Sequence, residues 1–134
     1  MKNTCFINNW DLVDCSAQHI VGAYLLTRNR DPIYRLARSK KIWERRISIM
    51  STFYFIKRNE FDDTLNLSET LKQDPEDLIH KAVGWMLREI GNRNIATEET
   101  FLKIHYQDMP RTMLRYAIGK FPEDKRQAYL KGKI

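Results

Sequence analysis

The sequence has few of the residues that hold small secreted or metal-binding proteins together. It contains two cysteines, Cys5 and Cys15, which are too few for a disulfide framework, so we expect reduced and mostly packed thiols. Cys15 and His19 have the only local spacing typical of metal ligands, whereas His80 and His105 lie far away in the sequence. Zinc normally takes three or four protein ligands, and we therefore expect no metal site.

Long apolar segments are also missing. No run of about 18 apolar residues is present, and the first residues lack the apolar stretch of a signal peptide. These absences argue against membrane insertion and secretion, so the cytoplasm is the expected location. A length of 134 residues predicts one domain, spanning residues 1–134.

Positive charge is in excess. The chain carries 23 lysines and arginines against 17 aspartates and glutamates, a net charge of +6, with an isoelectric point near 9.4. This balance favours a polyanion or an anionic surface as the partner, without identifying which.

Apolar residues recur at helical spacing along the chain, and the alternation typical of strands is absent. Proline next to acidic or capping residues marks four helix starts, at 31–32, 74–77, 108–110 and 121–124. Gly91 with Asn92 predicts the end of the helix that carries Trp85. We expect helices near residues 10–14, 16–28, 32–39, 41–58, 61–73, 76–91, 97–107, 111–120 and 122–131.

Three of these helical segments resemble one another and place a cation at Arg46, Lys81 and Arg115, with spacings of 35 and 34 residues. A period in the thirties with paired helices is typical of an α-solenoid, in which each repeat stacks on its neighbours. In a right-handed stack the second helices would line one concave wall and form a basic track suited to a DNA backbone. Alternatively, these cations are ordinary solvated surface.

Three motifs carry a more specific signal: Asn8–Asp14 (Asn-Asn-Trp-Asp-Leu-Val-Asp), Trp43–Arg46 and Lys81–Glu89. On helices, Trp10 and Asp14 would lie one turn apart on one face. In this order the motifs resemble the AlkD-like DNA alkylation repair glycosylases, and the resemblance covers about residues 6–130. It implies an all-α, HEAT-like superhelix of three to four helical repeats, a short α-solenoid.

The resemblance further implies a DNA glycosylase that hydrolyses the N-glycosidic bond of N3- or N7-alkylated purines in double-stranded DNA, with no cofactor. Trp10, Asp14, Arg46 and Trp85 match the family's active-site aromatics, acid and arginine. Further candidates for DNA contact are Arg45, Lys81, Arg88, Arg111, Thr112 and Arg115, of which Arg111 and Thr112 would open a helix.

The chemistry needs few groups because the leaving base already carries a positive charge. A general acid is unnecessary, in contrast to the two carboxylates of ordinary glycosidases. Asp14 would stabilise the oxocarbenium-like sugar electrostatically. Trp10 and Trp85 would present electron-rich faces to the cationic nucleotide, and Arg46 would hold a flanking phosphate.

The same residues could instead have purely structural roles. Asp14 could cap the helix that begins near Ser16, and Trp10 and Trp85 could be core residues. Trp43 is assigned to the core, in an apolar stripe with Ile47. A non-catalytic duplex DNA-binding module and a protein-interaction scaffold are the alternative functions.

Family members have several more helices before the Asn-Trp-Asp motif, which here begins eight residues from Met1. The chain is therefore expected to correspond to the C-terminal portion of such a protein. Loss of the other arm of the DNA cradle would weaken activity, because nonspecific affinity is largely the sum of phosphate contacts.

Overall fold

The computed structural model describes residues 29–134, and every regular element in this range is a helix. The predicted all-α fold is confirmed there, and seven of the nine expected helices are found within two residues of their predicted bounds, except for the shorter C-terminal end of α8. The helices are α3 (Asp31–Ala37), α4 (Ile42–Ile56), α5 (Asp62–Leu71), α6 (Asp77–Arg93), α7 (Ile95–His105), α8 (Arg111–Ala117) and α9 (Glu123–Leu130). The expected helices at 10–14 and 16–28 lie outside the described residues.

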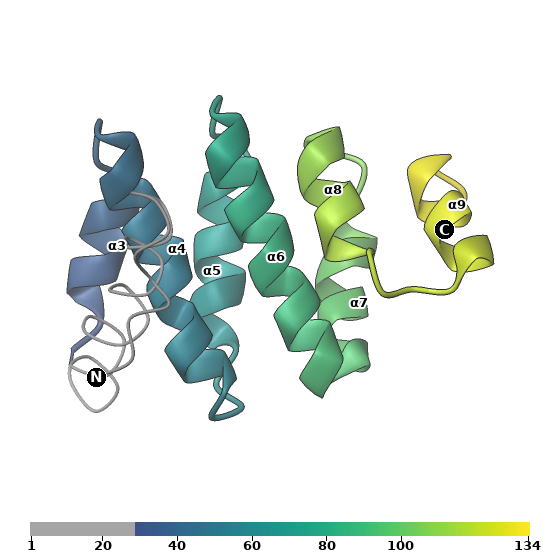
Figure 1. Ribbon diagram of the computed structural model, residues 1–134, viewed down its shortest axis with the longest axis horizontal. Helices are drawn as coiled ribbons and strands as arrows, with labels where there is room; N and C mark the ends of the chain where they lie inside the picture. Colours follow the sequence, from purple (N-terminus) through teal and green to yellow (C-terminus); the bar gives the residue numbers. More distant parts are fainter. Residues whose placement is uncertain (1–28) are drawn as a thin grey trace, which may run out of the picture.

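Helix α3 packs on α4 and α5 packs on α6, while α7 and α8 both pack on α6, and α9 follows at the C-terminal end (Figure 1). Helix α4 packs on α6, and α6 packs on α8, so these three second helices form one continuous layer. We call it the α4–α6–α8 layer. Arg46, Lys81 and Arg115 lie on its three successive helices, so each helix of the layer carries one of the three predicted cations.

The buried face of α6 follows the helical period, with Ile79, Ala82, Val83, Met86 and Ile90 all fully buried. Close packing on α8 depends on a glycine. A Cβ atom at Gly84 would lie 2.5 Å from the Met113 carbonyl oxygen and 2.5 Å from the Tyr116 Cβ. Any side chain there would push α6 and α8 apart, so Gly84 sets the spacing of the layer.

Helix α6 continues two residues past its predicted end at Gly91 and ends at Arg93. Asn94 has an extended backbone and ends it. The same Asn94 begins α7, where its side chain accepts a hydrogen bond from the Thr97 backbone N–H. Gly91 is a glycine for another reason: the Glu98 carboxylate occupies the space that a Cβ would need.

The assignment of Trp43 to the core is also wrong, since its side chain is 52% exposed. Trp43 lies in the first turn of α4, whereas the buried residues of that helix begin at Arg46. The apolar stripe read from the sequence therefore starts one turn before the helix becomes covered.

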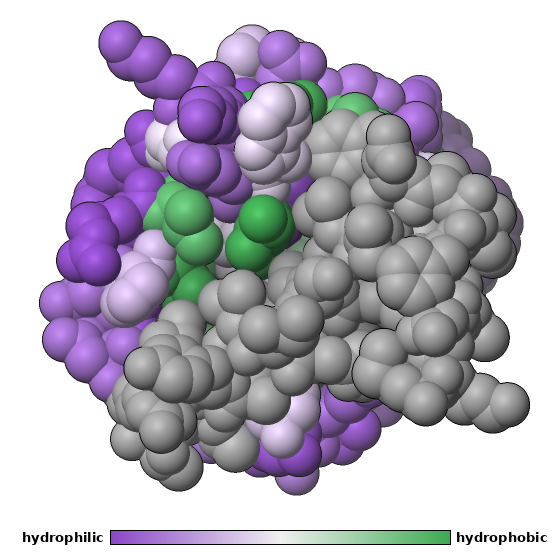
Figure 2. All heavy atoms as spheres, turned by 60° about the vertical axis from the view of Figure 1, so that its left-hand side comes forward, coloured by the Kyte–Doolittle hydropathy of each residue, from purple (hydrophilic) through white to green (hydrophobic). Residues whose placement is uncertain are grey.

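Viewed from the end formed by α3 and α4, most of the described surface in view is hydrophilic, and apolar side chains appear there only in small areas (Figure 2). Within residues 29–134, no helix has the length and apolar character required to cross a membrane.

Candidate nucleic-acid interface

Trp85 is the central aromatic side chain of the α4–α6–α8 layer. It is half-buried and packs against the core. Its indole Nε1 donates a hydrogen bond of 3.0 Å to Glu89 Oε2, one turn further along α6. Its ring meets the Phe53 ring of α4 at a centroid distance of 6.1 Å and an interplanar angle of 57°. Trp85 is therefore fixed on one side by a hydrogen bond and on another by an aromatic contact.

Phe53 carries a cation of its own. The Lys57 Nζ lies 4.6 Å from the centroid of the Phe53 ring, within the range of a cation–π interaction. Lys57 follows Phe53 by one helical turn and is exposed at the end of α4. Lys57, Phe53 and Trp85 thus form a chain of contacts that runs from α4 to α6.

Arg46 is buried and joins α4 to α6. Its guanidinium donates a hydrogen bond of 2.6 Å to the Leu78 carbonyl oxygen in the first turn of α6. Leu78 precedes Trp85 by seven residues, which corresponds to about 10 Å along the helix axis. Arg46 and Trp85, both predicted site residues, therefore belong to one layer. The point at which Arg46 contacts α6 lies about two helical turns from Trp85.

Arg45, another predicted DNA contact, has protein partners. Its Nε lies 2.6 Å from Asp74 Oδ2, and its Nη1 donates to the Ser39 carbonyl oxygen at 2.9 Å. The side chains of Arg45 and Asp74 are 13% and 5% exposed, so this ion pair is largely desolvated. Arg45 connects the α3–α4 loop with the α5–α6 loop.

Lys81 and Arg115 are the more accessible cations of the layer. The Lys81 Nζ lies 3.3 Å from Asp77 on the same helix, and the Lys81 side chain is 42% exposed. Arg115 is exposed on α8, and within residues 29–134 its side chain forms no hydrogen bond or ion pair. Both side chains can reach solvent on the two helices that carry them.

The remaining candidates have mixed surroundings. Arg111 is exposed but donates a hydrogen bond of 2.8 Å to the Leu130 carbonyl oxygen. Thr112, beside it, is partly buried. The Arg88 Nε is buried without a hydrogen-bond partner in the described part of the chain.

Trp10 and Asp14 lie outside the described residues. Of the four predicted catalytic residues, Arg46 and Trp85 can therefore be placed, and both belong to the α4–α6–α8 layer.

The α6–α7 junction holds a buried carboxyl group that the sequence did not reveal. Glu98 is 1% exposed, and its Oε2 has no hydrogen-bond partner among the described residues. Burial, helped by the negative charge of Glu99 and opposed by the positive charge of Arg88, raises the pKa of Glu98 to about 9. Glu98 is therefore protonated at neutral pH.

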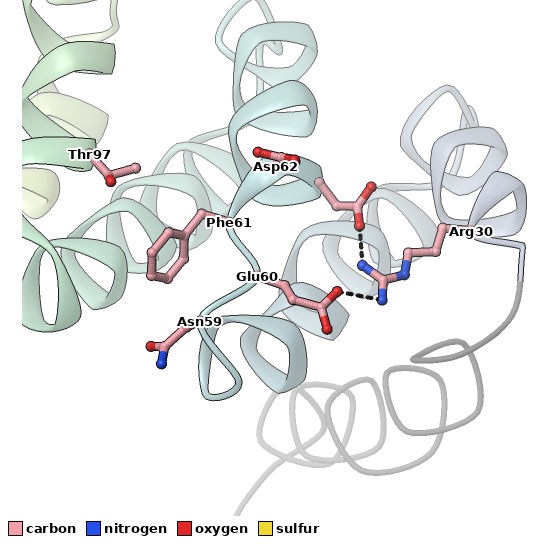
Figure 3. Close-up of a pocket in the computed structure, with 7 residues that line it drawn as sticks. Arg30, Asn59, Glu60, Phe61, Asp62 and Thr97 are labelled. Carbon is pink, nitrogen blue, oxygen red and sulfur yellow. Dashed lines mark hydrogen bonds and ion pairs between the residues drawn. The ribbon is translucent and has the colours of Figure 1, made fainter.

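A pocket of about 470 Å³ lies beside the α4–α5 loop, and its lining is acidic. Figure 3 shows Arg30 forming ion pairs with Glu60 and with an aspartate, Asp63. Asp62 adds a third carboxylate to the lining. Three acids against one arginine would repel a phosphate, so this pocket is a poor DNA site.

Metal ligation finds no support in the part of the chain that the structure describes, where no cluster of three suitable side chains occurs. His105 contacts the Lys72 ammonium at 2.8 Å, and burial followed by the Lys72 charge lowers the pKa of the His105 imidazole. His80 contacts the Asp74 backbone carbonyl oxygen.

Sequence reasoning missed Phe53, Lys57 and Glu89 as neighbours of Trp85. Part of the signal was available, because Lys57 follows Phe53 and Glu89 follows Trp85 by four residues, one turn on a helix face. The contact between Phe53 and Trp85 joins residues 32 positions apart and depends on how α4 packs on α6.

The chain also resembles a known family of proteins. The family model described as DNA alkylation repair enzyme matches residues 1–121. The searches of curated proteins and of solved structures returned no match.

Proposed function

The chain belongs to the DNA alkylation repair enzyme family, and from this premise we propose that it hydrolyses the N-glycosidic bond of N3- or N7-alkylated purines in duplex DNA. The observation that carries the proposal is the placement of Trp85. A half-buried indole, fixed by Glu89 and Phe53, lies on a layer of helices that also bears cations. DNA repair is the family's role, and the glycosylase chemistry and the purine specificity are our proposal.

In this proposal Trp85 contacts the cationic nucleotide through its ring face, an interaction worth roughly 0.5–2 kcal/mol. Trp10 would supply a second aromatic face. Asp14 would stand beside the sugar and stabilise the positive charge that develops as the base departs, while it positions the attacking water. The base leaves with its electron pair and becomes neutral, so no proton donor is needed.

The cations have different roles in the proposal. Arg46 supports the layer through its hydrogen bond to the Leu78 carbonyl oxygen, and in the proposal it also holds a flanking phosphate. Lys81, Arg88 and Arg115 extend the phosphate contacts along α6 and α8. Arg45, Arg111 and Thr112 act at the edge of this surface, and Arg45 does so mainly by fixing the loops around it.

Replacement of one carboxylate tests the chemistry. We expect Asp14→Asn to abolish excision of 7-methylguanine from a duplex, because the anion matters once the sugar becomes cationic. Affinity for the same duplex should stay near normal or rise slightly, since the variant removes a negative charge from a phosphate-binding surface. Asp11→Asn, three residues away in the same motif, is the matched control and should retain excision.

Unchanged excision by Asp14→Asn would reduce Asp14 to a helix cap and would contradict the proposed mechanism. The second candidate function is a non-catalytic module that binds duplex DNA through its backbone, and the exposure of Lys81 and Arg115 favours it. Salt-dependent binding of duplex DNA by the wild-type protein, without any excision at saturating protein, would select that function. Binding that does not change with salt would remove both.

A further inference from the structure

The ring faces near Trp85 differ in whether a cation already occupies them. Lys57 lies over the Phe53 ring at 4.6 Å, and Arg58 lies over the Tyr54 ring at 3.7 Å. Within residues 29–134, no lysine or arginine lies over the Trp85 ring. Tryptophan is the strongest cation–π acceptor of the aromatic residues, so of these three rings the strongest acceptor is the one over which no described residue places a cation.

Glu89 places a negative charge next to the Trp85 indole. Its Oε2 accepts the hydrogen bond from the Trp85 Nε1–H at 3.0 Å, while its Oε1 lies 3.4 Å from the Asn92 side-chain nitrogen. A hydrogen bond from a neutral donor to a carboxylate is charge-assisted and polarises the donor. Electron density in the indole shifts from the N–H edge into the ring, so the ring face becomes more negative.

The partial burial of both side chains preserves this effect. Glu89 and Trp85 are each partly covered, and a charge next to protein is screened less by water than an exposed one. The Glu89 field therefore favours a positively charged ring stacked on Trp85 over a neutral ring of the same shape. Stacking and dispersion are almost equal for the two ligands. The charge of the ligand is therefore the property that Trp85 and Glu89 together distinguish.

We propose that Glu89 is a specificity-determining residue of this site, which makes Trp85 select a positively charged purine over a neutral purine of the same shape. The inference deepens the proposed function and rests on it. Glu89 acts through Trp85, first by fixing the orientation of the indole and secondly by supplying charge to its face.

Binding to two matched duplexes separates charge from shape. One duplex carries 7-methylguanine on a 2′-fluorinated sugar, which keeps the base cationic and slows its loss; the other carries 7-methyl-7-deazaguanine, which is neutral. We expect the wild-type protein to bind the cationic duplex more tightly. Glu89→Gln keeps an acceptor for the indole N–H but loses the charge, and the ratio of the two dissociation constants should fall roughly threefold.

Glu69→Gln is the matched control. Glu69 lies on α5, outside the α4–α6–α8 layer, and its replacement removes the same charge from the chain. Both variants should bind all DNA somewhat more tightly, because each loses an anion, but the ratio should change only for Glu89→Gln. Glu89→Asp, which keeps the charge on a shorter side chain, should give an intermediate ratio and provides a second test if Glu89→Gln folds poorly.

An unchanged ratio in Glu89→Gln, with a wild-type protein that does discriminate, would overturn the role of Glu89 and leave the proposed function standing. A wild-type protein that binds both duplexes equally would overturn the role of Glu89 and also remove charge reading by Trp85 from the proposed function. An equal fall of the ratio in Glu69→Gln would assign the effect to net charge and likewise overturn the inference.

Discussion

The α4–α6 and α6–α7 junctions both bury ionisable groups, but they differ in whether those groups have hydrogen-bond partners. At the α4–α6 junction, Arg45 pairs with Asp74 and Arg46 donates to the Leu78 carbonyl oxygen. At the α6–α7 junction, the Glu98 Oε2 and the Arg88 Nε are buried without hydrogen-bond partners in residues 29–134. One junction satisfies its charges with partners, whereas the other removes a charge by protonation.

The same helix, α6, therefore borders one junction in which the buried polar groups have partners and another in which they do not. A buried pair with complete partners is costly to break, because loss of one member leaves the other uncompensated. A lone buried carboxyl group is costly to ionise, and its cost changes with pH. Four predictions test this comparison, beginning with the largest expected effect.

Glu98→Gln should remove a pH dependence of stability. The pKa of Glu98 is about 9 in the folded protein and near 4.5 in the unfolded chain, so between these values the folded state holds one proton more. Stability from this group is complete below about pH 4.5 and is lost as the pH rises toward 9. Relative to Glu98→Gln, the wild-type protein should lose roughly 4 kcal/mol between pH 5 and pH 8.

Urea denaturation of both proteins at several pH values measures this difference. Glu123→Gln, at an exposed position of α9, is the control: because it keeps Glu98, its stability should fall with rising pH as that of the wild-type protein does. A wild-type protein whose stability follows that of Glu98→Gln across the range would show that Glu98 ionises normally.

Arg45→Ala should destabilise the other junction by about 3 kcal/mol, because it leaves the Asp74 carboxylate buried and unpaired. Urea denaturation at pH 7 checks the value. Arg45→Ala combined with Asp74→Asn should recover part of the loss, since the double variant leaves no buried charge. A change below about 0.5 kcal/mol for the single variant would mean that the pair contributes no more than a surface ion pair.

Much of the fold followed from the sequence because helical periodicity and helix starts are local. The start signals at Asp31–Pro32 and Asp74–Asp77 coincide with the first residues of α3 and α6 as expected. The exposure of Trp43 and the full length of α6 could not be predicted, because both depend on which neighbouring helix covers a given turn.

The candidate site followed only in part for the same reason. Trp85 came from a motif, and its place on the α4–α6–α8 layer agrees with the repeat of cations. The pairing of Arg45 with Asp74 joins residues 29 positions apart, and no local pattern announces it. A basic motif in the sequence therefore reveals the charge of an arginine but not its partner in the fold. The partner determines whether that arginine can contact DNA.

Gly84→Ala tests a third junction, α6 with α8, which uses close packing instead of charge. The added Cβ would lie 2.5 Å from the Met113 carbonyl oxygen, so the two helices must separate, at a cost of about 2 kcal/mol. Gly132→Ala should instead reveal only the strain of its backbone, φ +71°, because no atom lies within 4 Å of a Cβ there. Equal stability of Gly84→Ala and wild type in urea would mean that α8 shifts freely.

Arg115→Ala should have the smallest effect on stability, below about 0.5 kcal/mol, because its side chain has no partner in the described part of the chain. Its effect should appear in DNA binding, as a salt dependence shallower by about one logarithmic unit of slope. Arg45→Ala, measured at a temperature where it is folded, should leave the slope nearly unchanged. The reverse result would exchange the structural and DNA-binding roles of the two arginines.

The stacking of helix pairs also has a mechanical consequence. Each pair contacts mainly its immediate neighbours, so bending the stack can be divided into small rotations at the junctions between them. Such a stack bends elastically, because the deformation is shared among several junctions. The close contact at Gly84 makes the α6–α8 joint stiff, and bending would concentrate at the α4–α6 joint, where Phe53 meets Trp85. A change in curvature of the bound duplex would then be felt first at the indole that we place against the damaged base.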